Sequence, residues 1–396
     1  MRPSVCLITE TFGFGGVEIH TLSLIKELIR KGSGIELVQC RHNEIFERNL
    51  NTVCPNGIRT FETMLSVNDE GVGLIRKWQE LLACMESDVL ILPKIAVEVG
   101  SIEFLKTCRK VFRRIILIEH SLPVSMPSKF SRLGFRDIAK GVVLWWYREK
   151  YRRRRVSLYA DKIVAVSKAA GEALKRDCWY PSDKISVIVN GVDLLRFRRN
   201  EQSAYEFKTK FNIDKADFVF GMVTRIEEVK GVDIAVEAFA GLLRRCHDRS
   251  VVLVICGGGG EGERVKQLIS ELGICKHVVL TGFIHEPDRA FSAMDSILLP
   301  SRSEALGITL LEGMAAGCIP IVSKVGGMPE VVNDRSIGWV VKPNDIEGFR
   351  SAMEQVLYLD SGRMEAMRKG VVKRVKDEFD SETSLEELIR FVEGEG

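Results

Sequence analysis

The sequence predicts an α/β protein with two doubly wound parallel sheets, and three observations support this. Its 396 residues correspond to two or three domains at roughly 150 residues per domain. Apolar residues make up 45% of the chain and charged residues 28%, as is typical of soluble globular proteins. Short β-branched runs alternate with longer helical patterns along nearly the whole chain. That alternation is typical of βαβ units around parallel sheets.

Ten apolar runs predict the strands, five in each half of the chain. Most of them are continuously apolar, as a strand buried on both faces of a parallel sheet requires. The runs in the first half are 4–9, 35–40, 88–93, 114–120 and 162–167. The runs in the second half are 218–223, 251–256, 277–282, 296–300 and 319–323. Each group predicts one sheet.

The domain boundary is expected near residue 190. A strand-like run inside 187–203 ends at Asn190-Gly191 and passes into a polar, Arg-rich stretch, which is the pattern of a turn and linker. We therefore expect one domain at 1–190 and a second at 191–374.

The end of the chain predicts an amphipathic helix. After Asp380 the leucines fall at helical spacing, and Ser381 or Thr383 can cap the helix. We expect the C-terminal helix, 375–396, to pack back on the first domain.

The composition excludes several classes of protein. The ten cysteines contain no C-x-x-C pair, and several, such as Cys6 and Cys256, lie inside apolar runs. They predict small buried residues in a reducing compartment instead of disulfides or a zinc site. No signal-peptide core and no run of about 18 apolar residues is present. The net charge of +3 is too small to favour nucleic acid. We expect a cytoplasmic protein with no nucleic-acid partner.

The segment 301–332 carries the strongest signal of a binding site. Glu304 lies in the turn after the strand 296–300, and Glu312 follows eight residues later in a predicted helix. Both acids are expected at the carboxyl edge of the sheet, where open α/β sheets bind ligands. The helix start would direct backbone N–H groups toward an anionic or hydroxyl-rich ligand. These N–H groups belong to Ala305, Leu306 and Gly307. Either glutamate taken alone is equally well explained as a solvated charge.

This segment resembles the E-x7-E signature of the fourth glycosyltransferase family, a large group of retaining GT-B enzymes also described as glycosyl transferases group 1. The turn 326–330 is similar to that family's GG-x-P-E, and the resemblance extends from Gly15 to about Asp345. Further matching motifs are GFGGVEIH (13–20), VSKAAGEAL (166–174), VIVNGVD (187–193), TRIEEVKG (224–231) and GGGGEGE (257–263). The family usually has Phe at Leu306, a position that we interpret as packing.

The resemblance implies the GT-B fold, in which two Rossmann-like domains face a central cleft and close on the substrates. The first domain would lie on the acceptor side, and the second would bind the nucleotide-sugar. The implied reaction moves a hexose-type sugar from a nucleoside diphosphate donor to a hydroxyl of a glycan or lipid-linked acceptor, with retention and by front-face attack. The departing diphosphate would itself take the acceptor proton.

Arg225 and Lys230 follow the strand 218–223 and supply two cations for the diphosphate, whose negative charge grows as the glycosidic bond breaks. Glu304 would hold the sugar hydroxyls and Glu312 the ribose hydroxyls. Neither a metal nor a cofactor is expected, because no convincing DxD-type cluster is present. Alternatively, Arg225 and Lys230 only pair with the surface residues Glu227 and Glu228.

Gly15 and Gly16 follow the first strand, where missing side chains let the backbone approach a phosphate. The resemblance implies that this loop faces the diphosphate. Glu18 and His20 are predicted on the acceptor side, although one of them could equally cap the following helix.

His120 ends the strand 114–120, and the resemblance implies a hydrogen bond to the donor sugar. Otherwise it is an ordinary histidine at a strand end. Gly257, Gly259 and Gly262 satisfy G-x-G-x-x-G, but the next strand ends without the carboxylate that a dinucleotide site needs. The resemblance instead assigns Gly257 and Gly259 to a loop that lines the nucleotide pocket.

Residues 129–155 combine Trp145, Trp146 and Tyr147 with many Arg and Lys residues. Such a stretch suits an anionic membrane surface, at the inner face of the membrane. A helix hairpin without membrane contact explains it equally well.

Two alternatives to the transferase remain open. A GT-B sugar-nucleotide 2-epimerase shares the fold but needs further acid/base residues that the sequence does not reveal. A non-catalytic, membrane-associated scaffold would not need the set formed by Arg225, Lys230, Glu304 and Glu312.

Overall fold

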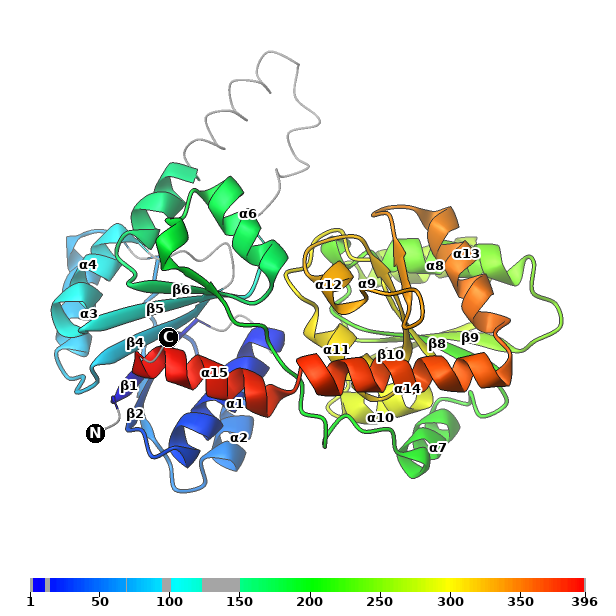
Figure 1. Cartoon of the computed structure of the whole chain (residues 1–396), viewed down its shortest axis with the longest axis horizontal. Helices are drawn as coiled ribbons and strands as arrows, with labels where there is room; N and C mark the ends of the chain where they lie inside the picture. Colours follow the sequence, from blue (N-terminus) through cyan, green and yellow to red (C-terminus); the bar gives the residue numbers. More distant parts are fainter. Residues whose placement is uncertain (1–2, 11–14, 69, 95–100, 123–149, 395–396) are drawn as a thin grey trace, which may run out of the picture. The chain divides into compact units, whose positions relative to one another are not determined.

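The computed structural model describes residues 3–10, 15–68, 70–94, 101–122 and 150–394. The chain forms two compact units (Figure 1). The first consists of Met1–Asn190 with Ser384–Gly396, and the second of Gly191–Thr383. The division falls between Asn190 and Gly191, as predicted.

The first unit contains a parallel sheet with the order β3-β2-β1-β4-β5-β6-β7 among the described residues. Its strands are β1 (Val5–Thr9), β2 (Ile35–Gln39), β3 (Arg59–Glu62), β4 (Val89–Lys94), β5 (Arg114–Glu119), β6 (Lys162–Ala165) and β7 (Ile185–Val187). Its helices are α1 (Gly16–Arg30), α2 (Glu44–Val53), α3 (Val72–Leu82), α4 (Ile102–Val111), α6 (Lys168–Cys178) and most of α15 (Ser381–Glu393). A short turn, η2 (Ser182–Lys184), precedes β7, and residues 150–157 are also helical. Figure 1 shows α1 and α2 on one face of the sheet, and α3 and α4 on the other.

The second unit repeats the arrangement with the order β10-β9-β8-β11-β12-β13, again all parallel. Its strands are β8 (Phe218–Val223), β9 (Val251–Cys256), β10 (Val278–Gly282), β11 (Ser296–Leu299), β12 (Ile319–Ser323) and β13 (Trp339–Val341). Its helices are α7 (Glu201–Lys210), α8 (Val232–Leu243), α9 (Gly262–Glu271), α10 (Pro287–Ala293), α11 (Ile308–Ala315), α12 (Met328–Val331), α13 (Ile346–Leu357) and α14 (Ser361–Glu378), with a short turn η3 (Glu228–Lys230). Phe220, Phe239 and Phe349 are fully buried where the sheet packs against α8 and α13.

All ten predicted strands are confirmed to within three residues at each end. Three further strands, β3, β7 and β13, were not predicted, and all three are at or near a sheet edge. In β3 the side chains are largely exposed, so its sequence, RTFE, lacks the apolar run that a central strand needs. The other two are only three residues long.

The end of the chain divides differently from the prediction. Residues 375–383 stay with the second unit, where Val375 is fully buried and the Val192 N–H donates to the Phe379 carbonyl at 2.9 Å. Only from Ser384 does α15 belong to the first unit. The helix begins at Ser381, one of the two predicted caps. The Asp380 carboxylate, just before it, accepts a hydrogen bond from the Glu382 N–H at 3.4 Å.

Within the first unit, α15 is fixed by its apolar face and by backbone contacts. Arg114 on β5 donates to the Val392 carbonyl at 2.8 Å, and its guanidinium lies over the Phe391 ring. The buried side chains of this helix are Leu385, Leu388, Ile389, Phe391 and Val392. In the parts of the chain that the structure describes, no helix combines the length and the apolar character needed to cross a bilayer.

Candidate functional site

Three loops meet at the carboxyl edge of the second sheet. They are 224–231 after β8, 257–261 after β9 and 300–307 after β11. The strand order reverses its direction between β8 and β11, and ligands of doubly wound sheets bind at this switch point. Arg225, Lys230 and Glu304 all lie on the two loops that flank it.

Two glycines allow the first two loops to pack closely together. Gly257 has φ +140° and Gly259 has φ +155°, a region that favours glycine. A Cβ atom on Gly257 would lie 1.8 Å from the Thr224 carbonyl oxygen, and one on Gly259 would lie 2.4 Å from that of Ile226. The Ile226 N–H donates to the Gly258 carbonyl at 2.8 Å. The structure therefore shows a packing role for both glycines, and their contact with a nucleotide stays a prediction.

Lys230 and Glu304 form an ion pair across two loops, with 2.6 Å between Nζ and Oε2. Both side chains are largely buried, at 20% and 17% exposed. The approach depends on Gly231, whose φ is +65° and whose added Cβ would lie 2.2 Å from the Pro300 carbonyl oxygen. The structure thus brings together a cation and an acid that were predicted separately.

Arg225 lies in the same loop but more openly. Its guanidinium pairs with Glu227 at 2.6 Å, and the two side chains are 64% and 37% exposed. The alternative of local pairing therefore holds for Arg225, whereas Lys230 pairs with Glu304 and not with Glu228. An exposed pair of this kind is weak, so Arg225 can leave Glu227 for a more strongly charged partner.

Glu312 lies in the second turn of α11, with a buried side chain. Burial raises its pKa to about 7, and the charge of Asp288 adds to this, while the charge of Arg196 opposes it. Helix α11 begins at Ile308 after Gly307, which has φ +90°, so the predicted helix start is confirmed.

The residues just before α11 are held from the neighbouring turn. The Gly327 N–H donates to the Ala305 carbonyl at 2.9 Å. The Leu306 side chain is 2% exposed, as a packing position requires.

Arg302 and Asp233 join the loop 300–307 to the first turn of α8, and the sequence did not single them out. Arg302 donates to both carboxylate oxygens of Asp233, at 3.0 and 2.7 Å. Burial tends to raise the pKa of Asp233, but the hydrogen bond and charge of Arg302 keep that pKa below its ordinary value. The available signal was position: Arg302 precedes Glu304 by two residues, and Asp233 follows Lys230 by three.

A pocket lies beside these loops. Its polar lining consists of Glu227, Glu228, Asp233, Glu261 and Arg264. Four carboxylates against one guanidinium repel an anionic ligand, so this pocket is not the place for a diphosphate.

In the first unit, His20 and His120 lie together. Their ring centroids are 4.8 Å apart. Burial lowers the pKa of His20 to about 4, and burial together with the charge of His20 lowers the pKa of His120 well below its ordinary value. Both rings are therefore neutral at pH 7.

The nitrogen atoms of the two rings differ in their partners. The Asn190 amide nitrogen faces His120 Nδ1 at 3.4 Å, which leaves the ring proton on Nε2. His120 Nε2 and His20 Nδ1 have no hydrogen-bond partner among the described residues. Asn190 was predicted only as part of the boundary turn.

The loop before α1 differs from its prediction in one residue. Glu18 Oε2 accepts a hydrogen bond from the Gly15 N–H at 2.8 Å, so Glu18 caps α1 and its carboxylate is buried. The alternative of a capping role is correct for Glu18. Gly15 has φ −161°, an extended conformation that any residue adopts, and Gly16 is the first residue of α1. Their approach to a phosphate stays a prediction.

The basic stretch 129–155 lies mostly outside the described residues. In its described part, Lys150 and Arg153 are buried. Lys150 Nζ donates to the Arg176 carbonyl at 3.3 Å and lies over the Trp179 ring. These two basic side chains therefore pack within the first unit, and membrane contact of the remainder stays a prediction.

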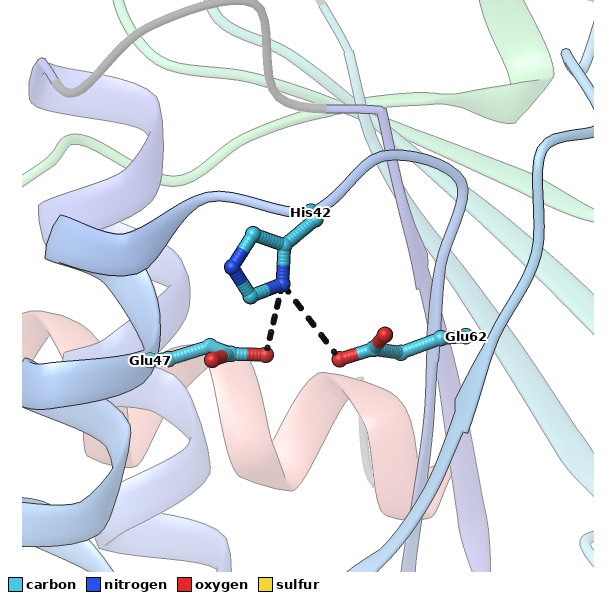
Figure 2. A group of neighbouring side chains, drawn as sticks. All are labelled: His42, Glu47 and Glu62. Carbon is cyan, nitrogen blue, oxygen red and sulfur yellow. Dashed lines mark ion pairs between the residues drawn. The ribbon is translucent and has the colours of Figure 1, made fainter.

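A separate cluster is formed by His42, Glu47 and Glu62 (Figure 2). His42 Nδ1 lies 3.3 Å from Glu47 and 3.7 Å from Glu62, and the hydrogen bond between the two carboxyl groups raises the pKa of Glu47. The side chains are 30–55% exposed. The three side chains therefore lie within pairing distance of one another at the surface of the first unit.

Two family models match the chain, one in each unit. The model described as Glycosyltransferase Family 4 matches residues 14–196, and the model described as Glycosyl transferases group 1 matches residues 204–374.

Individual relatives agree with these models. The chain is 24% identical over 386 residues to an uncharacterised glycosyltransferase of Methanocaldococcus jannaschii, covering 95% of this chain and 93% of that protein. It is 30% identical to a GDP-mannose-dependent alpha-(1-6)-phosphatidylinositol monomannoside mannosyltransferase of Mycolicibacterium smegmatis, over 54% of this chain and 57% of that protein. The crystal structure of Anabaena HepE in complex with UDP and glucose is similar in fold, with a TM-score of 0.79, 16% identity, and coverage of 99% of this chain and 100% of HepE.

Proposed function

We propose that this chain, which is a GT-B glycosyltransferase resembling glycosyltransferase family 4, transfers a hexose-type sugar from a nucleoside diphosphate donor to a hydroxyl of a glycan or lipid-linked acceptor, with retention of configuration. The observation that carries the proposal is the Lys230–Glu304 pair at the switch point of the second sheet. A cation and an acid side by side suit a ligand whose diphosphate is joined directly to a polyhydroxylated ring.

Lys230 can bind the diphosphate without losing Glu304. An ammonium group has three donor hydrogens, and Glu304 accepts at 2.6 Å from one of them. Arg225 has donors beyond the one directed at Glu227. Two cations on the leaving diphosphate stabilise the negative charge that grows as the glycosidic bond breaks. In this proposal the departing diphosphate takes the acceptor proton.

The carboxylates hold the two ends of the donor. Glu304 has an acceptor oxygen beyond the one bound to Lys230 and binds the sugar hydroxyls. Glu312 accepts hydrogen bonds from the ribose hydroxyls. Because the cations already neutralise the diphosphate, the reaction needs no metal ion, and turnover in excess chelator should equal turnover without it.

Different observations support the proposed class of sugar and the proposed class of acceptor. The mannosyltransferase relative and the HepE complex both name a hexose, mannose in one and glucose in the other. The same relative acts on a phosphatidylinositol monomannoside, and the basic, aromatic composition of 129–155 suits an acceptor carried in an anionic membrane. Failure of the purified protein to co-sediment with anionic vesicles at low salt would contradict the membrane part.

The test is a panel of UDP- and GDP-hexoses, first in thermal shift and then in turnover with the anomeric configuration of the product assigned. A donor well above its dissociation constant raises the melting temperature. A 2-epimerised nucleotide-sugar would identify the epimerase instead. Absence of binding and turnover with every donor would favour the scaffold.

A further inference from the structure

Arg302 forms hydrogen bonds to three residues that flank Lys230. Its backbone N–H donates to the Val229 carbonyl at 2.8 Å, and its guanidinium donates to the Glu228 carbonyl. The same guanidinium forms a two-pronged pair with Asp233 in the first turn of α8. The acceptors therefore lie both before and after Lys230 in the chain.

The turn needs this support because it is short. It is a 3₁₀ turn of three residues without a side-chain cap, and it ends at Gly231 in a left-handed conformation. Such turns have poorer hydrogen-bond geometry than an α-helix. Lys230 also has a long flexible side chain, so the position of its ammonium group depends on how firmly its backbone is held.

Arg302 and Glu304 act from the same loop on the same turn. Arg302 holds the backbone on both sides of Lys230, and Glu304 holds the Lys230 ammonium group at 2.6 Å. Arg302 also offsets local negative charge, because Glu228, Asp233 and Glu261 all contribute to its electrostatic environment.

On the basis of the proposed function, we infer that Arg302, clamped to Asp233, is a positioning residue that sets Lys230 and Glu304 in register for the donor diphosphate. Arg302 does this through the turn and makes no contact with the diphosphate itself. Lysine cannot replace it fully, since an ammonium group lacks the planar fork that binds both carboxylate oxygens.

The second unit offers a matched control. Arg368 on α14 pairs with Asp295, and the two side chains are 20% and 15% exposed, against 28% and 25% for Arg302 and Asp233. Asp295 lies at the amino end of β11, where its N–H donates to the Val219 carbonyl. The two pairs thus match in chemistry and burial but lie at opposite edges of the sheet.

The experiment measures binding of UDP and GDP by calorimetry to the full chain and to the variants Arg302→Ala, Arg302→Lys, Asp233→Asn and Arg368→Ala. We expect Arg302→Ala to weaken nucleotide binding on the order of tenfold, because a displaced Lys230 loses part of its charged contact with the diphosphate. Arg302→Lys and Asp233→Asn should lose less. Arg368→Ala should lower the melting temperature but leave the dissociation constant within about twofold.

A double-variant cycle separates positioning from general destabilisation. In a Lys230→Ala background, Arg302→Ala should add less than about twofold, since Arg302 acts through Lys230. An equal loss in both backgrounds, or wild-type affinity in Arg302→Ala, would overturn the inference while leaving the proposed function standing. If Arg302→Ala does not fold, Arg302→Lys and Asp233→Asn decide in the same cycle. Failure of the wild-type chain to bind either nucleotide would overturn both.

Discussion

The imidazole rings of His20 and His120 lie edge to face, with 4.8 Å between their centroids, so neither can gain a proton without placing charge beside the other. Because burial lowers the pKa of His20 to about 4, the folded chain binds this proton less tightly than the unfolded chain, whose histidines titrate near 6.5. The stability contributed by neutral His20 is present above pH 6.5 and is lost as the pH falls toward 4.

We expect His20→Gln to remove this loss of stability at acid pH. The loss in the free energy of unfolding is about 3 kcal/mol at most, at 1.36 kcal/mol per pKa unit. Hydrogen exchange of β1 and β5 at pH 4.5 and 7 reports on the first unit alone. His247→Gln, at an exposed position, is the control and should behave as wild type. An unchanged pH profile in His20→Gln would contradict the assignment.

For Glu312 we expect the opposite pH dependence of stability, in the second unit. Its folded pKa of about 7 lies above the ordinary glutamate value of 4.5, so the neutral acid is favoured in the folded state. Its stabilisation is complete below pH 4.5 and is lost as the pH rises through 7. Glu312→Gln should remove this loss from hydrogen exchange of β11 and β12. Glu263→Gln, a control with an 88% exposed side chain, should retain it.

We expect substitution of Lys230 to cause a large loss of turnover. If Lys230 stabilises the leaving diphosphate, Lys230→Ala should reduce kcat/KM for the donor roughly a hundredfold. The control is Lys266→Ala on α9, which removes an exposed pair with Glu263 and should stay within about twofold. Equal activity of the two variants would remove Lys230 from the reaction.

We expect Gly259→Ala to destabilise the protein much more than Gly258→Ala. An alanine there combines φ +155° with a Cβ atom 2.4 Å from the Ile226 carbonyl oxygen, which should cost on the order of 3 kcal/mol. A Cβ on Gly258 meets nothing within 4 Å, so Gly258→Ala should change the free energy of unfolding by less than about 1 kcal/mol. The measurement is urea unfolding of both variants. Equal urea midpoints would show that the loops 224–231 and 257–261 separate readily.

The central strands could be predicted because parallel strands buried on both faces require apolar runs. The start of α11 could be predicted because it follows the strand 296–300 after a short turn. The edge strand β3 could not be, because its exposed side chains remove that requirement. Lys230 and Glu304 were predicted separately, since each lies in its own motif.

Their ion pair depends on the approach of two loops 74 residues apart, which no local pattern encodes. Asp233 and Arg302 were missed for the same reason. Glu18 was predicted on the acceptor side with capping of the following helix as an open alternative, and the structure shows its hydrogen bond from the Gly15 N–H.

The return of α15 to the first unit also bears on how the protein is made. A ribosome synthesises residues 384–393 only after the whole second unit. The hydrogen bond from Arg114 on β5 to the Val392 carbonyl can therefore form only at the end of synthesis. The second unit is continuous in sequence and can fold as it emerges. The first unit can bury the apolar side chains of Leu388 and Ile389 only after the second unit has been synthesised.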